Sequence, residues 1–281
     1  MTFRLLECVS VPGDPTKTNE DAFQHRADAA VVLDGATMLG DGLMPGPSDA
    51  AWIAQFGARR LMAHLGEGNG ARKALRATLA DAQKSFEALR RHEPEDMWQT
   101  PCASMMLAVR NEAGLELLWF GDCAALIKQG DMPVMVVGET LDKRVAEADR
   151  ARAMAKEKAV SPAASLSRPE FIDALRKSRN RVNSGDNWLF SPDVRAASHA
   201  VRRSVKVAAG STLLLATDGF LALASDYGAY GVDGLMAAAM DKGLAVLGEE
   251  LRAIEAGDAG GDRFPRFKKS DDATALLIEV T

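Results

Sequence analysis

Residues 213–220 read LLLATDGF, an apolar run that ends in an aspartate followed at once by a glycine. Three leucines and an alanine are typical of a buried strand, so Asp218 falls where that strand ends. A carboxylate in such a place is costly to bury unless another group compensates its charge. The stretch therefore predicts a strand and, at its end, a site that requires a partner for Asp218.

The same arrangement recurs along the chain, and five segments place acidic side chains where an apolar strand begins or ends. These segments are TKTNEDAF (16–23), AAVVLDGAT (29–37), LLWFGDC (117–123), LLLATDGF (213–220) and KKSDDATALLI (268–278). Their acids are Glu20, Asp21, Asp34, Asp122, Asp218, Asp271 and Asp272. One aspartate at a strand end is common because it hydrogen-bonds its own turn. Five such segments are better explained by convergence on one site.

Converging carboxylates repel one another, and a bound cation would offset that repulsion. The ligands would all be oxygen atoms, with no histidine or cysteine paired to them, which favours Mg²⁺ or Mn²⁺, with Ca²⁺ as an alternative, over Zn²⁺ or Cu²⁺. Gly35 and Gly219 follow their aspartates directly and would let the backbone turn close to an ion. A pair of hard ions bridged by carboxylates typically serves phosphoester hydrolysis.

Length and composition limit the classes of protein to consider. The chain has 281 residues, roughly one or two domains, and its 47% hydrophobic content supports a sizeable core. The net charge of -5 argues against nucleic acid or an anionic membrane as the main partner. No apolar run reaches the roughly 20 residues of a membrane helix, and no signal peptide is evident. We therefore expect a cytoplasmic protein.

Strands and helices are expected in blocks, which favours an α+β domain with antiparallel sheets and helices packed outside. Strands are expected at 3–10, 28–33, 103–109, 115–120, 123–128, 132–137, 201–207, 212–217 and 273–280, with the acidic segment at 20–21 leading into a further strand. Helices are expected after Ser48 and at 71–91, 142–159, 169–181 and about 233–254. Strands 103–137 are expected to form one antiparallel meander, and 142–187 to be an insertion on one face.

Taken in order, these segments resemble the metal-dependent protein phosphatase family (PPM, the type 2C Ser/Thr phosphatases), as an atypical, bacterial-type member. The matching motifs are Asn19-Glu20-Asp21-Ala22, Val32-Leu33-Asp34-Gly35, Gly121-Asp122, Ala216-Thr217-Asp218-Gly219 and Asp271-Asp272-Ala273-Thr274. The resemblance implies a single domain over 1–281, built as a four-layer α-β-β-α sandwich of two antiparallel sheets flanked by helix pairs. It also implies that 142–187 is a flap beside the substrate groove.

The resemblance further implies a site with two Mn²⁺ or Mg²⁺ ions and possibly a third. Asp34 would bridge the two ions, with Gly35 offering its carbonyl. Asp218 and Asp271 would complete the shell of one ion. The remaining ligands would be Glu20 and Asp21 at the second ion and Asp122 at the third. Asp34 and Asp218 are the expected catalytic residues, and a water bridging the ions would attack a phosphorylated protein substrate.

Phosphate recognition departs from the family pattern. Thr16 stands where the family usually has a phosphate-binding arginine, and Ala36 stands where eukaryotic relatives have a histidine. Lys17 is a candidate replacement, although its ammonium is a point charge rather than a fork. Arg176 and Arg179, in a basic run of the expected flap, are further candidates, while a solvated helix face is the alternative interpretation of that run.

Two other functions fit parts of the pattern. A catalytically weak protein of the same fold could sense phosphate or bind a partner, as the altered phosphate-binding positions suggest. An aspartyl-phosphate hydrolase would need a second acid two residues after Asp34, where the chain has Ala36, and a parallel sheet. The antiparallel pattern disfavours this last class.

Overall fold

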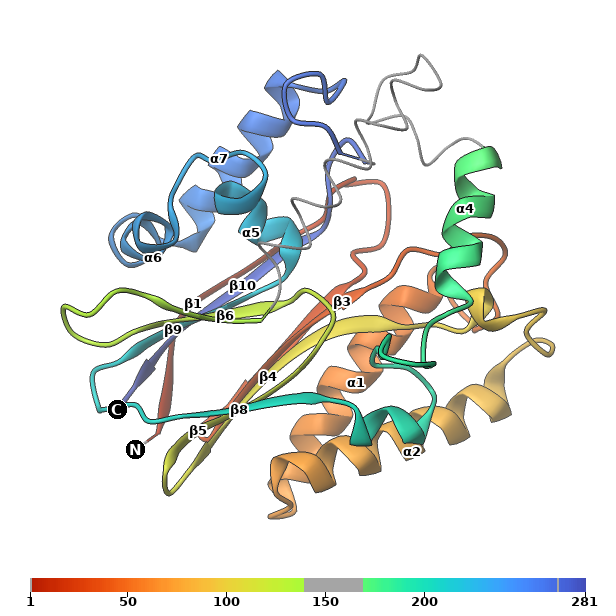
Figure 1. Cartoon of the computed structure of the whole chain (residues 1–281), viewed down its shortest axis with the longest axis horizontal. Helices are drawn as coiled ribbons and strands as arrows, with labels where there is room; N and C mark the ends of the chain where they lie inside the picture. The colour runs from red at the N-terminus through yellow and green to blue at the C-terminus, as the bar shows by residue number, and fades with distance from the viewer. Residues whose placement is uncertain (1, 139–168, 267) are drawn as a thin grey trace.

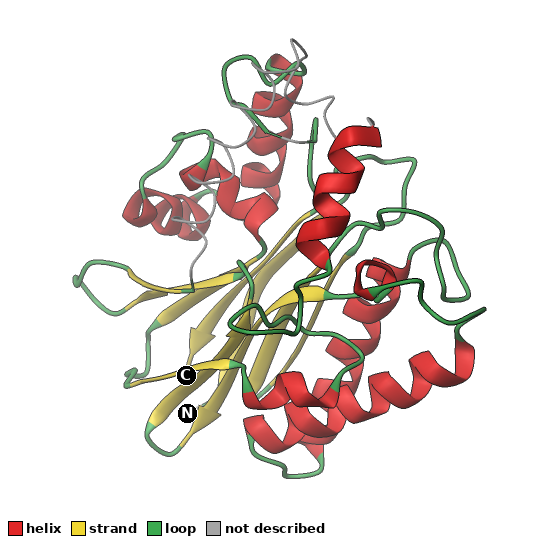
Figure 2. Cartoon of the chain, turned by 45° about the vertical axis from the view of Figure 1, so that its right-hand side comes forward, coloured by secondary structure: helices red, strands yellow, loops and turns green. Residues whose placement is uncertain are grey.

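Two five-stranded antiparallel sheets lie face to face with helices on both outer sides (Figures 1 and 2). The computed structural model describes residues 2–138, 169–266 and 268–281, and the helix expected at 142–159 lies outside the described residues. The α+β class and the four-layer sandwich are thereby confirmed. No helix in the described ranges has the length and apolar character needed to cross a membrane.

The first sheet has, in spatial order, β1 (Phe3–Val11), β10 (Ala273–Val280), β9 (Thr212–Ala216), β6 (Ala124–Lys128) and β7 (Met135–Val137). The second sheet has β2 (Asp21–Arg26), β3 (Ala29–Gly35), β4 (Ala103–Asn111), β5 (Gly114–Phe120) and β8 (Val201–Val205). The described helices are α1 (Asp49–Gly66), α2 (Ala71–Leu89), η1 (Met97–Gln99), α4 (Pro169–Arg179), η3 (Val194–Ser198), α5 (Asp218–Ser225), α6 (Val232–Asp241) and α7 (Leu244–Gly257).

The alternation of side chains along β3 explains why this strand, apolar from Ala29 to Leu33, lies inside the sandwich. Its odd-numbered residues, such as Val31 and Leu33, pack against α1 and α2. Its even-numbered residues, such as Val32, pack against the other sheet. Successive side chains of a strand point to opposite faces, so a strand that is buried on both sides needs no polar alternation.

Strand β9 has the same property in the other sheet. Leu213 and Leu215 face the space between the sheets. Leu214 and Ala216 face α5, α6 and α7. The leucine run of 213–215 is thus held between two apolar layers, and the chain emerges from it directly into the first turn of α5.

The predicted meander over 103–137 is wrong at one step, the expected pairing of β5 with β6, whereas the pairs β4–β5 and β6–β7 are present. Strands β4 and β5 do form the expected hairpin. After β5, however, the chain crosses to the other sheet, where β6 pairs with β9 and β7. The crossing occurs at Gly121, whose φ of 67° is in the left-handed region that glycine adopts without strain.

The predicted single helix at 233–254 is also wrong, because the structure has two helices there. Helix α6 ends at Asp241 and α7 begins at Leu244. Gly243 between them has a φ of 86°, which is incompatible with a continuous right-handed helix. Helix α5 was not predicted, because its apolar run, FLALA (220–224), is too short for periodicity to distinguish a helix from a strand.

Phe190 attaches the segment after α4 to the second sheet. Its backbone exchanges two hydrogen bonds with Ala103, at 2.8 and 3.0 Å. Its ring is fully buried and lies against Gly57 of α1, where an added Cβ would come within 2.6 Å of it. One aromatic side chain therefore links the segment after α4, the sheet and α1.

We expect Phe190→Ala to lower the free energy of unfolding by about 3–5 kcal/mol, because it leaves a cavity between α1 and the sheet. Chemical denaturation measures the change. Leu89→Ala is the control, since Leu89 is 51% exposed and its loss leaves no cavity. Equal stabilities of the two variants would contradict this account of the core.

Candidate metal centre

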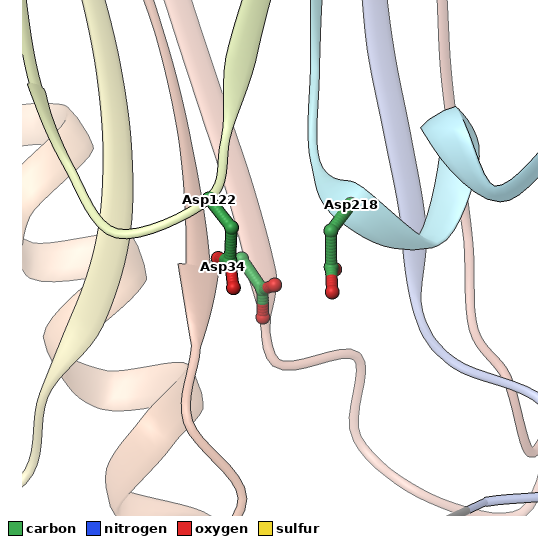
Figure 3. A group of neighbouring side chains, drawn as sticks. All are labelled: Asp34, Asp122 and Asp218. Carbon is green, nitrogen blue, oxygen red and sulfur yellow. The ribbon is translucent and has the colours of Figure 1, made fainter. Parts of the chain in front are cut away.

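Three carboxylates converge where the two sheets meet (Figure 3). Asp34 lies near the end of β3, Asp122 follows β5 in the crossing between sheets, and Asp218 is the first residue of α5. One oxygen of each lies within 4.8 Å of the corresponding oxygens of the other two. Figure 3 shows Asp34 and Asp122 side by side, with Asp218 approaching from the opposite sheet.

Asp21 lies directly beside this group. It is the partner of Asp34 in the β2–β3 register and is almost fully buried. Its Oδ2 accepts a hydrogen bond from the Thr217 hydroxyl at 2.9 Å. Its Oδ1 is buried and accepts no hydrogen bond from the part of the chain that the structure describes.

Burial and mutual repulsion together disfavour the charged forms of these acids. Burial is the largest cause that raises the pKa of Asp34, followed by the charges of Asp218 and Asp21. Burial likewise raises the pKa of Asp21, and the charges of Asp272 and Asp271 add to the effect. A buried carboxylate oxygen without a donor, among carboxylates with raised pKa values, is the environment that a hard divalent cation would relieve. The residues present therefore fit such an ion.

Asp271 has a cationic neighbour within the chain. The Lys268 ammonium lies 2.7 Å from its Oδ1. Burial opposes the charge on Lys268, but the charges of Asp271, Asp34 and Asp218 outweigh it and raise the pKa of this lysine. Lys268 thus supplies part of the positive charge that the acids require, and the sequence analysis did not single it out.

Glu20 makes contacts beside the cluster. Its carboxylate accepts hydrogen bonds from the hydroxyls of Thr37 at 2.7 Å and Ser48 at 2.6 Å. Ser48 also caps α1, because its side chain accepts from the Ala51 backbone N–H at 3.1 Å. Glu20 therefore ties the start of α1 to the segment that follows β3, and its predicted role as a metal ligand stays a prediction.

Asp272 joins two loops through its side chain. It accepts hydrogen bonds from the backbone N–H groups of Gly13 at 2.8 Å and Glu20 at 2.5 Å. The second aspartate of the Asp271-Asp272 pair therefore fixes backbone rather than facing the three clustered acids. The resemblance assigned a metal to Asp271 and no role to Asp272, and the backbone contacts of Asp272 are found only in the structure.

Ser104 orients Asp122. It lies opposite Asp34 in the β3–β4 register and donates its hydroxyl to Asp122 Oδ1 at 2.6 Å. The serine was missed in the sequence analysis, although a lone polar residue in the apolar run ASMMLAV (103–109) signals a specific hydrogen bond.

The two glycines that follow Asp34 and Asp218 permit close backbone contacts. A Cβ on Gly35 would lie 2.5 Å from the Ala50 carbonyl oxygen and 2.7 Å from that of Glu20. A Cβ on Gly219 would lie 2.0 Å from the Asp272 carbonyl oxygen. Each glycine thus allows an acid-bearing segment to touch its neighbour, while the predicted metal contact of the Gly35 carbonyl stays untested.

The three candidates for phosphate binding have other partners in this structure. Lys17 is 79% exposed and lies 3.9 Å from Asp14. Arg176 donates to the Leu39 carbonyl, and Arg179 donates to the Thr37 carbonyl at 2.7 Å. Their assignment to a substrate phosphate remains a prediction.

We expect Gly219→Ala to lower the free energy of unfolding by about 1–3 kcal/mol, because the methyl group forces α5 away from the Asp272 backbone. The matched control is Gly234→Ala in α6, where the nearest atom to an added Cβ is 3.9 Å away. Thermal denaturation of both variants is the measurement. If Gly219→Ala is as stable as Gly234→Ala, the close approach is not required.

No family model matches the chain, and no curated protein matches it. Solved structures do match over the whole length. The serine/threonine phosphatase PstP/Ppp of Mycobacterium tuberculosis superposes with a TM-score of 0.59 at 16% identity, covering 100% of this chain and 99% of that one. The PPM Ser-Thr phosphatase MsPP of Mycobacterium smegmatis, in complex with cacodylate, gives 0.58 at 17% identity and 99% coverage of both chains.

A further match is the catalytic domain of the serine threonine protein phosphatase PstP in complex with two manganese ions. It gives a TM-score of 0.54 at 17% identity and covers 100% of this chain and 99% of that one. At these identities the likeness is one of fold.

Proposed function

We propose that this chain, which has the PPM (type 2C) Ser/Thr phosphatase fold, is a metal-dependent phosphomonoester hydrolase acting on phosphorylated serine or threonine of proteins. The observation that carries the proposal is the convergence of Asp34, Asp122 and Asp218 from both sheets. The buried Oδ1 of Asp21 beside them supports it, because it adds a further oxygen ligand without a donor.

The proposed ligands of two Mn²⁺ or Mg²⁺ ions, and of a third where one binds, are Glu20, Asp21, Asp34, Gly35, Asp122, Asp218 and Asp271. When bound, such ions acidify water and neutralise phosphoryl oxygens. Asp34 and Asp218, the proposed catalytic residues, hold the reacting centre between the sheets. Ser104 and Thr217 fix the carboxylates of Asp122 and Asp21 by hydrogen bonds, so little reorganisation is needed when substrate arrives.

We expect the protein to hydrolyse p-nitrophenyl phosphate with Mn²⁺ or Mg²⁺ and to lose the activity in EDTA. Asp218→Asn should lower kcat by roughly 100-fold or more, because it removes a charge at the reacting centre. Asp241→Asn, an exposed acid at the end of α6, is the control and should behave as the wild type.

A metal-dependent rate that survives in Asp218→Asn would argue against this centre as the site of hydrolysis. A panel of phosphoserine and phosphothreonine peptides, run with the same variants, tests the proposed substrate class separately from the artificial ester.

The second candidate function is that of a catalytically weak protein that senses phosphate or binds a partner. The ion pair of Lys268 with Asp271 favours it, because an ammonium within the cluster offsets part of the acidic charge without any metal. Thr16, at the position of the usual phosphate-binding arginine, favours it as well.

We expect Lys268→Met to bind Mn²⁺ about tenfold more tightly than the wild type. The substitution keeps the aliphatic stem and removes a charge that competes with the ion, and the 35% exposure of this side chain limits the gain. Isothermal titration calorimetry measures the affinity, with Lys269→Met, an exposed neighbour, as control.

An unchanged affinity in Lys268→Met would show that the ammonium does not compete. Wild-type protein that binds no Mn²⁺, beside a Lys268→Met variant that does, would favour the second candidate function over the first.

A further inference from the structure

Helix α4 is attached to the segment of residues 36–41, the post-β3 loop, which directly follows Asp34 and Gly35. We propose that Arg179 of α4 is a positioning residue that holds this loop and thereby couples the flap helix to the metal centre. The inference rests on the proposed metal-dependent function.

Arg179 reaches the loop at its first two residues. Its NH1 group donates to the Thr37 carbonyl at 2.7 Å and to the Ala36 carbonyl at 3.4 Å. The N–H of Ala36 donates in turn to the Cys102 carbonyl at 2.9 Å. The peptide unit next to Gly35 is thus held on one side by the second sheet and on the other by the flap helix.

Arg176 makes the attachment of α4 firmer. Its Nε and NH2 groups donate to the Leu39 carbonyl at 3.0 and 2.7 Å, and its guanidinium lies over the Trp98 ring at 4.0 Å. Asn180, just after the helix, accepts from the Trp98 backbone N–H at 2.8 Å. The C-terminal turn of α4 is therefore fixed to both the loop and η1.

A short series of contacts leads from Arg179 to the acids. Thr37, whose carbonyl Arg179 holds, donates its hydroxyl to the Glu20 carboxylate at 2.7 Å. The Glu20 carbonyl accepts from the Gly35 N–H at 3.1 Å. Glu20 precedes Asp21, and Gly35 follows Asp34, so a shift of Thr37 displaces the neighbours of both buried carboxylates.

Measured metal and phosphate affinities distinguish a positioning role of Arg179 from two other roles. A phosphate-binding arginine would change phosphate affinity and leave metal affinity alone. A mere positive neighbour of the acids would, on removal, tighten metal binding. A positioning arginine predicts the opposite sign, with weaker metal binding although a positive charge is lost.

The test compares Arg179→Met, Arg179→Lys and the exposed control Lys177→Met on the same helix. Calorimetric titration with Mn²⁺ measures metal affinity without turnover. Hydrolysis of p-nitrophenyl phosphate gives kcat and KM, and inorganic phosphate at saturating Mn²⁺ gives an inhibition constant.

We expect Arg179→Met to weaken Mn²⁺ binding about tenfold and to lower kcat, with the phosphate inhibition constant unchanged. Arg179→Lys should recover part of the affinity, and Lys177→Met should match the wild type. Unchanged or tighter Mn²⁺ binding in Arg179→Met would overturn the proposal, and weaker phosphate inhibition alone would assign the arginine to substrate.

Thr37→Val provides a second test, and its effect as a single variant does not depend on the folding of the arginine variant. It removes the hydroxyl that contacts Glu20, and we expect it to weaken Mn²⁺ binding, with a non-additive effect when combined with Arg179→Met. Additive effects of the two substitutions on Mn²⁺ affinity would show that Thr37 and Arg179 act independently, which contradicts the proposal. Wild-type protein that binds no Mn²⁺ overturns both the inference and the proposed function, whereas normal binding in every variant overturns the inference alone.

Discussion

Repulsion among the carboxylates gathered between the sheets is the constraint on which much of the surrounding structure depends. Asp34, Asp122 and Asp218 lie close together at the meeting of two apolar layers, and burial raises the pKa values of Asp34 and Asp21. The acid-bearing segments are held by hydroxyl donors, by backbone N–H groups, by tightly packed glycines and, at Asp271, by the ammonium of Lys268. The favourable free energy of packing in the rest of the sandwich offsets the repulsion among these charges.

Most strands of the fold could be predicted from sequence because their signal is local, whereas the four-layer arrangement was implied by the resemblance to the phosphatase family. A run such as LLLATDGF contains its own strand and its own end, and apolar strands without polar alternation indicate burial on both faces. The crossing of the chain after β5 could not be predicted in this way. Gly121 permits the crossing, but only the packing of the two sheets selects it. Helix α5 could not be predicted either, since its short apolar run, FLALA (220–224), fits a strand as well as a helix.

The acids of the candidate centre were likewise visible, whereas their supporting residues were not. Ser104 is a single hydroxyl outside the quoted motifs, and its importance follows from the strand register. Thr217 lies within a quoted motif, but its hydrogen bond to Asp21 is seen only in the folded chain. The charges of Lys268 and Arg179 were plain in the sequence, but their partners were not. Lys268 pairs with a carboxylate, and Arg179 donates to backbone carbonyls. Only the structure distinguishes these two kinds of contact.

The origin of Asp34 and Asp218 in different sheets has a consequence for assembly. Strand β3 belongs to one sheet and β9 to the other, so neither sheet alone supplies all the proposed ligands. A cation held between them would act as a cross-link between layers that are joined mainly by non-directional apolar contact. Because such a ligand binds only the docked state, its binding free energy would add directly to the cohesion of the sandwich. Removal of the ion by a chelator would then lower the stability of the sandwich as well as abolish the proposed metal-dependent activity.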